Sequence, residues 1–115
     1  MPHQKNFLLN RLEPEFLARI VPHLSVVELG HSDVLAETHE RIEKVYFPHS
    51  GIISCVVELA GGGGVESGII GNDGVRGQSG ARYKVSLNHV VTQVGGMASV
   101  IASDRIREVA DELRV

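Results

Sequence analysis

The sequence predicts a single, mainly β domain: an antiparallel sandwich or barrel with short helices before and after it. Three observations lead to this fold class. Apolar residues recur at helical spacing near both ends of the chain, whereas the period changes between residues 25 and 102. Segments of strand length there are separated by turn signals about every 8–12 residues, as in all-β sandwiches and barrels. Aromatic residues make up only 4% of the chain, so Val, Ile and Leu must build the core, and β-branched residues favour strands.

Two short helices are expected over residues 6–24. Asn6 can cap the first, NFLLNRL, because an asparagine side chain can accept hydrogen bonds from the free N–H groups of a first turn. The second begins near Pro14, since proline suits the first helical position, and ends before Pro22. The residues expected to face the core are Phe7, Leu8, Leu12, Phe16, Leu17, Ile20 and Leu24.

The β-barrel is expected over residues 25–102. Its predicted strands are SVVEL, DVLAET, KVYFPHSG, IISCVVEL, VESGII, HVVTQV and MASVIA. In the longest of them, IISCVVEL, successive side chains leave opposite faces of the strand. Ile53 and Cys55 therefore lie on one face and Ser54 lies on the other. The run AGGGG at 60–64 predicts a hairpin turn, because glycine enters positive φ without steric strain.

A terminal helix is expected over residues 103–115, with Ser103 as its cap. It carries one apolar stripe, Ile106, Val109, Ala110 and Leu113. Two interpretations of that stripe stay open. It is either the start of a seam between two chains or a face that packs on its own barrel.

Composition restricts the partners. At 115 residues the chain is of single-domain size. The net charge of −3, with acidic and basic residues mixed, gives no basic face for nucleic acid. A single cysteine, Cys55, fits a reducing cytoplasm. No apolar run approaches the ~20 residues of a membrane span, and the start does not have the pattern of a signal peptide. We therefore expect a cytoplasmic protein with no membrane partner.

Residues 65–94 organise the predicted site. This stretch has two strand-like apolar ends and, between them, a loop rich in glycine and small polar residues. Exposed backbone N–H groups in such a loop can face an anion. The loop therefore predicts a pocket for a small ligand.

Three stretches resemble a known family: LARIVPHLSVVEL, RIEKVYFPHSGIISCVVEL and GIIGNDGVRGQSG. They resemble the cyclic-nucleotide-binding (effector) domain of the Crp–Fnr superfamily of bacterial transcription regulators, and the likeness covers nearly the whole chain. The resemblance implies a cyclic-nucleotide-binding-like sensory domain over residues 1–115, with an antiparallel jelly-roll (double-stranded β-helix) barrel over residues 25–102. It also implies a ligand-sensing regulatory domain, a homodimer through the C-terminal helix, and DNA binding only through a C-terminal winged helix-turn-helix that this chain lacks.

The effector implied by the resemblance is a cyclic nucleotide or another small anion, with no metal. The residues implied for ligand binding are Ser67, Gly68, Arg76, Gly77, Gln78, Ser79, Asn88, His89 and Val90. Those implied for dimerisation are Ile106, Val109, Ala110 and Leu113.

The predicted pocket departs from the family pattern at two places. Gln78 stands where nucleotide-binding relatives have a glutamate for the ribose hydroxyl, and His89 stands where they have the arginine that pairs with the phosphate. Losing a bidentate, charge-assisted pair costs roughly 1.5–3 kcal/mol. These departures disfavour binding of cyclic AMP or cyclic GMP through the usual contacts.

Several residues also have purely structural interpretations. Ser67 and Gly68 either line the pocket or are small because strands crowd there, and His89 either binds an anion or begins a strand at the surface. Arg82 and Lys84 add positive charge or belong to a solvated loop. A ligand-free dimerisation module with a degenerate pocket is the alternative function.

Catalysis is not expected. The six histidines are scattered singly, without the close spacing of a metal site, and Cys55 has no base beside it in the sequence. One cysteine also excludes an iron–sulfur cluster held by this chain alone. For haem, His89 is a conceivable axial ligand, without further support.

Overall fold

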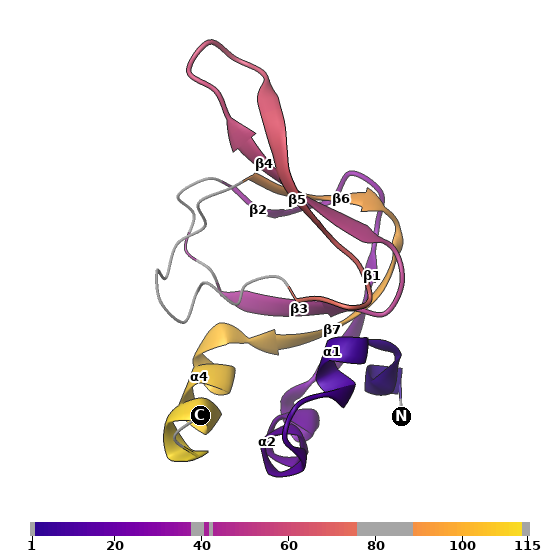
Figure 1. The fold of residues 1–115 in the computed structure, drawn as a ribbon, viewed down its shortest axis with the longest axis vertical. Helices are drawn as coiled ribbons and strands as arrows, with labels where there is room; N and C mark the ends of the chain where they lie inside the picture. The colour runs from indigo at the N-terminus through magenta and orange to yellow at the C-terminus, as the bar shows by residue number, and fades with distance from the viewer. Residues whose placement is uncertain (1, 38–40, 42, 76–88, 114–115) are drawn as a thin grey trace.

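The computed structural model describes residues 2–37, 41, 43–75 and 89–113. Within these residues seven strands form two antiparallel sheets that lie face to face, and the helices cover the outer face of one sheet (Figure 1). The predicted fold class is confirmed. The two sheets are hydrogen-bonded separately and do not close into a barrel among the described residues, because the edge strands β1 (Ser25–Leu29) and β2 (Val34–Ala36) pair only with β7 and β6.

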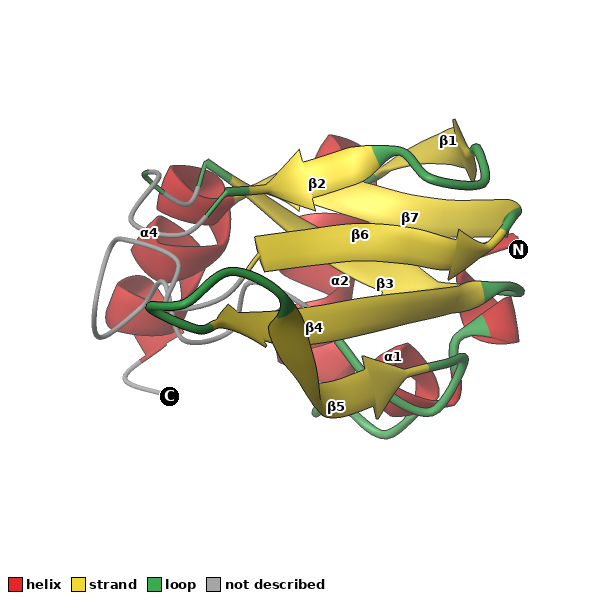
Figure 2. Cartoon of the chain, turned by 90° about the horizontal axis from the view of Figure 1, so that it is seen from above, coloured by secondary structure: helices red, strands yellow, loops and turns green. Residues whose placement is uncertain are grey.

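The three-stranded sheet has the order β1-β7-β3, in which β3 spans Lys44–Pro48 and β7 spans Gly96–Ala102. The four-stranded sheet has the order β2-β6-β4-β5. Its longer strands are β4 (Ile52–Glu58), β5 (Gly64–Ile70) and β6 (His89–Val94). Figure 2 shows β1 and β2 together at one edge of the sandwich and β5 at the opposite edge. The predicted hairpin turn before β5 is confirmed, with positive φ at Gly62 and Gly63.

The helices are short. They are η1 (Pro2–Lys5), α1 (Phe7–Asn10), α2 (Pro14–Ile20), η2 (Val21–His23) and α4 (Ser103–Leu113). The predicted cap is confirmed, since the Asn6 side chain accepts from the N–H of Leu9 at 3.0 Å. The prediction that Phe7 faces the core is wrong: its side chain is 54% exposed, and Leu9 is the fully buried residue of α1. The Asn6 side chain also donates to the carbonyls of Pro48, at the end of β3, and of Gly74, in the turn after β5, which fixes how this single helical turn is rotated.

Strand alternation divides the apolar residues between two cores. On β3, Val45 and Phe47 face the helices, whereas Tyr46 faces the other sheet. The core under the helices consists of Leu9, Phe16, Ile20, Val45, Phe47, Ile101 and Val109. The core between the sheets consists of Leu29, Ile53, Cys55, Val90, Ala98 and Val100. The three-stranded sheet is therefore covered on both faces.

A histidine pair lies on the helix side of β7. Ser99 Oγ is within hydrogen-bond distance of both His3 Nδ1 and His49 Nε2, and the two rings meet edge to face with centroids 6.3 Å apart. A hydroxyl has one proton, so it can donate to only one of these nitrogens and must accept from the other. Burial lowers the pKa of His3, assisted by the positive amino terminus. Burial also lowers the pKa of His49, followed by the charges of His3 and Lys5.

These shifts predict that the domain is less stable in acid. A histidine whose pKa is lower in the folded state binds fewer protons there than in the unfolded chain, so stability increases with pH. The contribution is complete above the ordinary pKa of 6.5 and is lost as the pH falls through the lowered folded-state values. Urea unfolding at about pH 8 and about pH 5 should show a lower midpoint in acid. The His49→Gln variant should show a smaller difference between the urea midpoints at the two pH values. The His23→Gln variant changes an exposed histidine and should show the same difference as the wild type. Equal slopes in all three proteins would contradict the prediction.

Candidate ligand site

A cavity of about 320 Å³, partly open to solvent, lies between the two sheets at the edge where β1 and β2 come together. Its apolar lining comes from both sheets and consists of Val27, Leu29, Val34, Leu35 and Val100, of which Val34 is exposed. Two polar residues of β3, Lys44 and Tyr46, also line it. The cavity therefore combines an apolar wall with one ammonium and one phenol group.

The charged groups of the cavity differ in their availability. The Asp33 carboxylate accepts from the N–H of Gly30 at 2.9 Å, so it is engaged in closing the β1–β2 turn. Glu28 also lies at the cavity wall, but it stands between Val27 and Leu29 on β1, so its side chain leaves the opposite face of the strand. Burial raises the pKa of the Tyr46 phenol, so this hydroxyl keeps its proton at neutral pH.

Sequence reasoning did not find this cavity. The alternation in KVYFP indicates that Lys44 and Tyr46 share a face, but it does not tell which face the helices cover. The predicted site lay instead in the loop before β6. Of its residues, Arg76, Gly77, Gln78, Ser79 and Asn88 lie outside the described residues, as do Arg82 and Lys84.

Ser67 and Gly68 lie on β5, where the ladder to β4 shifts register. Cys55 pairs with Gly68 and Val56 pairs with Glu66, so Ser67 is the extra residue of a bulge. Its hydroxyl donates to the carbonyl of Cys55 at 3.1 Å. A Cβ at Gly68 would meet nothing within 4 Å, so crowding between strands does not explain this glycine.

His89 and Val90 open β6 and point in opposite directions. Val90 is fully buried between the sheets, so His89 points away from that space by strand alternation. The Nδ1 of His89 lies 3.1 Å from Glu37 Oε2, just after the end of β2. This placement favours the surface interpretation of His89 over an anion site between the sheets.

Solved structures of similar shape identify the fold. The regulatory domain of Toxoplasma gondii PKA with cAMP matches with a TM-score of 0.80 and 17% identity over 97% of this chain and 43% of that chain. The sensor domain of the transcriptional regulator DNR from Pseudomonas aeruginosa matches with a TM-score of 0.77 and 11% identity, over 96% of this chain and 75% of that chain. A cyclic nucleotide-binding-like protein from Brucella abortus matches with a TM-score of 0.71 and 18% identity, over 90% of each chain. The chain has the fold of a cyclic-nucleotide-binding domain.

The resemblance drawn from the sequence is thus confirmed at the level of fold, including the jelly-roll arrangement of the strands. No protein-family model matches the sequence, and no curated protein does. The chain spans less than half of the Toxoplasma chain that it matches.

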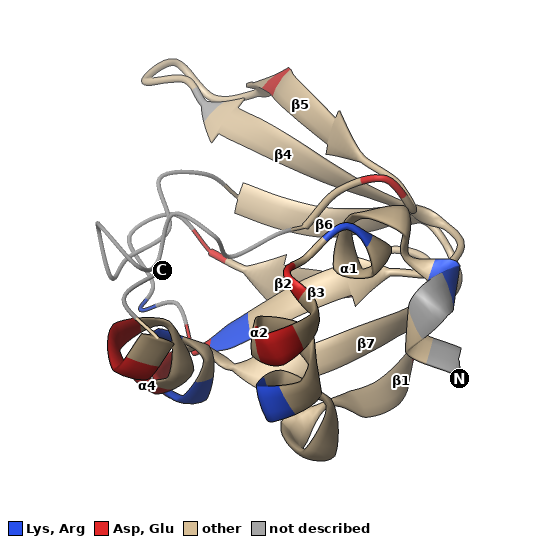
Figure 3. Ribbon diagram, turned by 60° about the horizontal axis from the view of Figure 1, so that its bottom comes forward, with Lys and Arg blue, Asp and Glu red and all other residues tan. Residues whose placement is uncertain are grey.

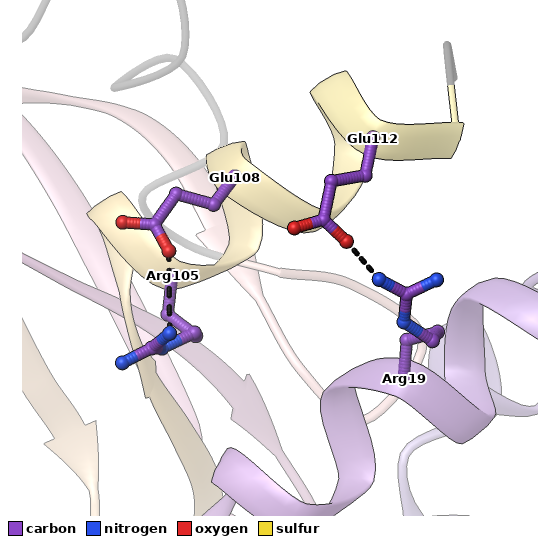
Figure 4. Close-up of polar contacts among 4 residues, drawn as sticks. All are labelled: Arg19, Arg105, Glu108 and Glu112. Atoms are coloured by element: carbon purple, nitrogen blue, oxygen red, sulfur yellow. Dashed lines mark hydrogen bonds and ion pairs between the residues drawn. The ribbon is translucent and has the colours of Figure 1, made fainter.

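In this cyclic-nucleotide-binding fold the stripe of α4 packs on its own chain. Val109 is buried, and the other three stripe residues are half-buried against the core that also holds Phe16 and Ile20 of α2. An ion pair between Arg19 and Glu112 joins α2 to α4, and Arg105 and Glu108 pair along α4 at 3.2 Å (Figure 4). Packing on its own domain is therefore one role of the stripe, and the seam between two chains stays a prediction.

Charge and metal ligands set further limits. Acidic and basic segments alternate along α2 and α4 in Figure 3, as the mixed charges of the sequence indicate. Within the described residues no three His, Cys, Asp or Glu side chains are grouped as a metal site. None of the helices described for this chain has the length and apolarity needed to cross a membrane.

Proposed function

We propose that this chain is the small-ligand-sensing regulatory domain of a Crp–Fnr-type bacterial transcription regulator acting in the cytoplasm. The observation that carries this proposal is the cavity of about 320 Å³ between the sheets of a cyclic-nucleotide-binding fold. Pockets for small molecules typically enclose about 300–1,000 Å³ and combine an apolar wall with a few polar groups. The domain binds and does not catalyse. DNA binding belongs to another part of the regulator.

The connection from the cavity to the helices supports a signalling role. Val100 lines the cavity on one face of β7, and Ile101, the next residue, belongs to the core under the helices. β7 then continues directly into α4 at Ser103, whose N–H donates to the carbonyl of Glu43 at 2.9 Å. A ligand that binds one arrangement of the three-stranded sheet more tightly would shift α4 with it.

Thermal unfolding with a panel of ligands tests the proposal. Cyclic AMP, cyclic GMP, cyclic di-GMP and aliphatic and aromatic carboxylates would each be added at millimolar concentration. A ligand that binds only the folded state at 100 times its Kd adds about 2.7 kcal/mol, which raises the Tm of a domain of this size by roughly 10 °C. At least one member should raise the Tm. If none does, the sensing function is wrong, and the ligand-free dimerisation module becomes the better interpretation.

A further inference from the structure

The polar groups of the cavity come from one strand. Lys44 and Tyr46 are two residues apart on β3, so their side chains leave the same face. That face is turned toward the other sheet, because the intervening Val45 belongs to the core under the helices. Among the described residues neither Lys44 nor the Tyr46 hydroxyl has a hydrogen-bond or ion-pair partner. Both groups therefore line the cavity from a single strand.

The cavity has an ammonium group at one end and a carboxylate at the other. In the sheet register Lys44 pairs with Ala102, whereas Leu29, the last residue of β1, pairs with Gly96 of the same strand. Six residues of extended strand separate these levels by about 20 Å. Asp33 lies in the turn after β1, and its carboxylate accepts from the N–H of Gly30. An anionic group is thus attracted to the Lys44 end.

The apolar wall lies between these ends. Val27 and Leu29 from β1, Leu35 from β2 and Val100 from β7 line it. Such a wall gains free energy from an apolar body but offers no partner for a hydroxyl-rich one, whose polar groups would lose their hydrogen bonds to water. Tyr46 pairs with Val100 in the sheet, so it stands beside the wall and two residues from Lys44 on the same strand.

We infer that this cavity binds a small organic monoanion, an aliphatic or aromatic carboxylate whose apolar body lies along β1 and β2 and whose carboxylate pairs with Lys44 and accepts from the Tyr46 hydroxyl. The inference rests on the proposed sensing function and names the ligand class of its cavity. It places the ligand at the β1–β2 edge, whereas the sequence placed the site in the loop before β6.

Decanoate is a suitable probe, with decanol as its uncharged counterpart. Titrations followed by calorimetry and by backbone amide NMR shifts would compare the wild-type chain with Lys44→Gln and Tyr46→Phe. Lys44 is exposed, so solvent screens the pair and its removal should raise the Kd of decanoate by roughly fivefold at low salt. Removing the Tyr46 hydroxyl should raise it by roughly threefold. Lys5→Gln removes the same charge from η1, whose His3 contacts the helix side of β7, and should leave the Kd unchanged.

Shifts concentrated in β1, β2 and β3, together with weaker binding of decanol than of decanoate, would support the inference. An unchanged Kd in Lys44→Gln, equal affinity for decanol, or shifts confined to other strands would overturn it. If decanoate does not bind but a cyclic nucleotide raises the Tm, the carboxylate ligand class is rejected and the sensing function is retained. Absence of binding by decanoate and by every member of the ligand panel would reject both.

Discussion

Asn6→Ala is expected to lower the free energy of unfolding by about 3–5 kcal/mol. Asn6 is fully buried, and its side chain makes three hydrogen bonds. Its Oδ1 caps α1, and its Nδ2 donates to the carbonyls of Pro48 at 2.7 Å and Gly74 at 2.9 Å. Alanine removes the cap and leaves two carbonyls without this donor.

The three hydrogen bonds of the Asn6 side chain, called the Asn6 clamp below, join three parts of the chain. Pro48 ends β3, Gly74 lies in the turn after β5, and the N–H of Phe7 donates to the carbonyl of Asn72 in that same turn at 2.7 Å. Asn6 therefore joins the N-terminal helix to the end of β3 and to the turn at 71–74. A change at Asn6 should therefore also loosen the turn at 71–74.

Asn6→Ser separates the two roles. A serine hydroxyl can cap α1 but is too short to reproduce both donations, so this variant should recover about 1 kcal/mol relative to alanine. Urea unfolding of the three proteins would give the differences. Amide hydrogen exchange at residues 71–74 would show whether the clamp is lost. A loss below 1 kcal/mol in Asn6→Ala would show that water replaces the clamp.

Local chemistry made part of this structure predictable. The cap at Asn6, the break at Pro22 and the glycine turn before β5 depend on neighbouring residues, and all three are where the sequence places them. Strand periodicity also indicated which residues share a face. The overall fold followed from these patterns and from the family resemblance.

Long-range contacts were not predictable in the same way. Nothing near Asn6 in the sequence indicates that Pro48 and Gly74 will meet it, and the partner of His89, Glu37, is 52 positions away. Likewise, alternation on β3 assigned Tyr46 and Phe47 to opposite faces but left open which face the helices cover. The cavity depends on that choice, so it emerged only from the packing of the two sheets.

Gly51→Ala is expected to destabilise the domain by about 3–5 kcal/mol. Gly51 has a φ of +82°, which disfavours an L side chain. A Cβ there would also lie 2.5 Å from the carbonyl oxygen of Val94 and 2.9 Å from that of Gly95. Both obstacles are backbone atoms, which cannot turn aside as a flexible side chain can.

Gly62→Ala is the matched control. Gly62 has a similar φ of +89°, but a Cβ there would meet nothing within 4 Å. The control therefore carries the conformational strain alone, about 1–2 kcal/mol, and the difference between the two variants measures the close approach at Gly51. Urea unfolding at neutral pH would give both values. Equal losses of unfolding free energy in the two variants would show that the backbone around Gly51 shifts to make room for the added methyl group.

The close approach at Gly51 matters because it holds the two sheets together. Gly51 lies between β3 and β4, and Gly95 lies between β6 and β7, so each residue connects one sheet to the other. The turns touch again at Gly96, where a Cβ would lie 2.4 Å from the carbonyl oxygen of Ser50. Gly51→Ala must push these turns apart, and with them the two sheets that line the cavity. We therefore expect the variant to weaken decanoate binding under conditions where it is still folded, whereas Gly62→Ala should bind decanoate as the wild type does. Unaltered binding in folded Gly51→Ala would show that the turn does not set the spacing of the sheets.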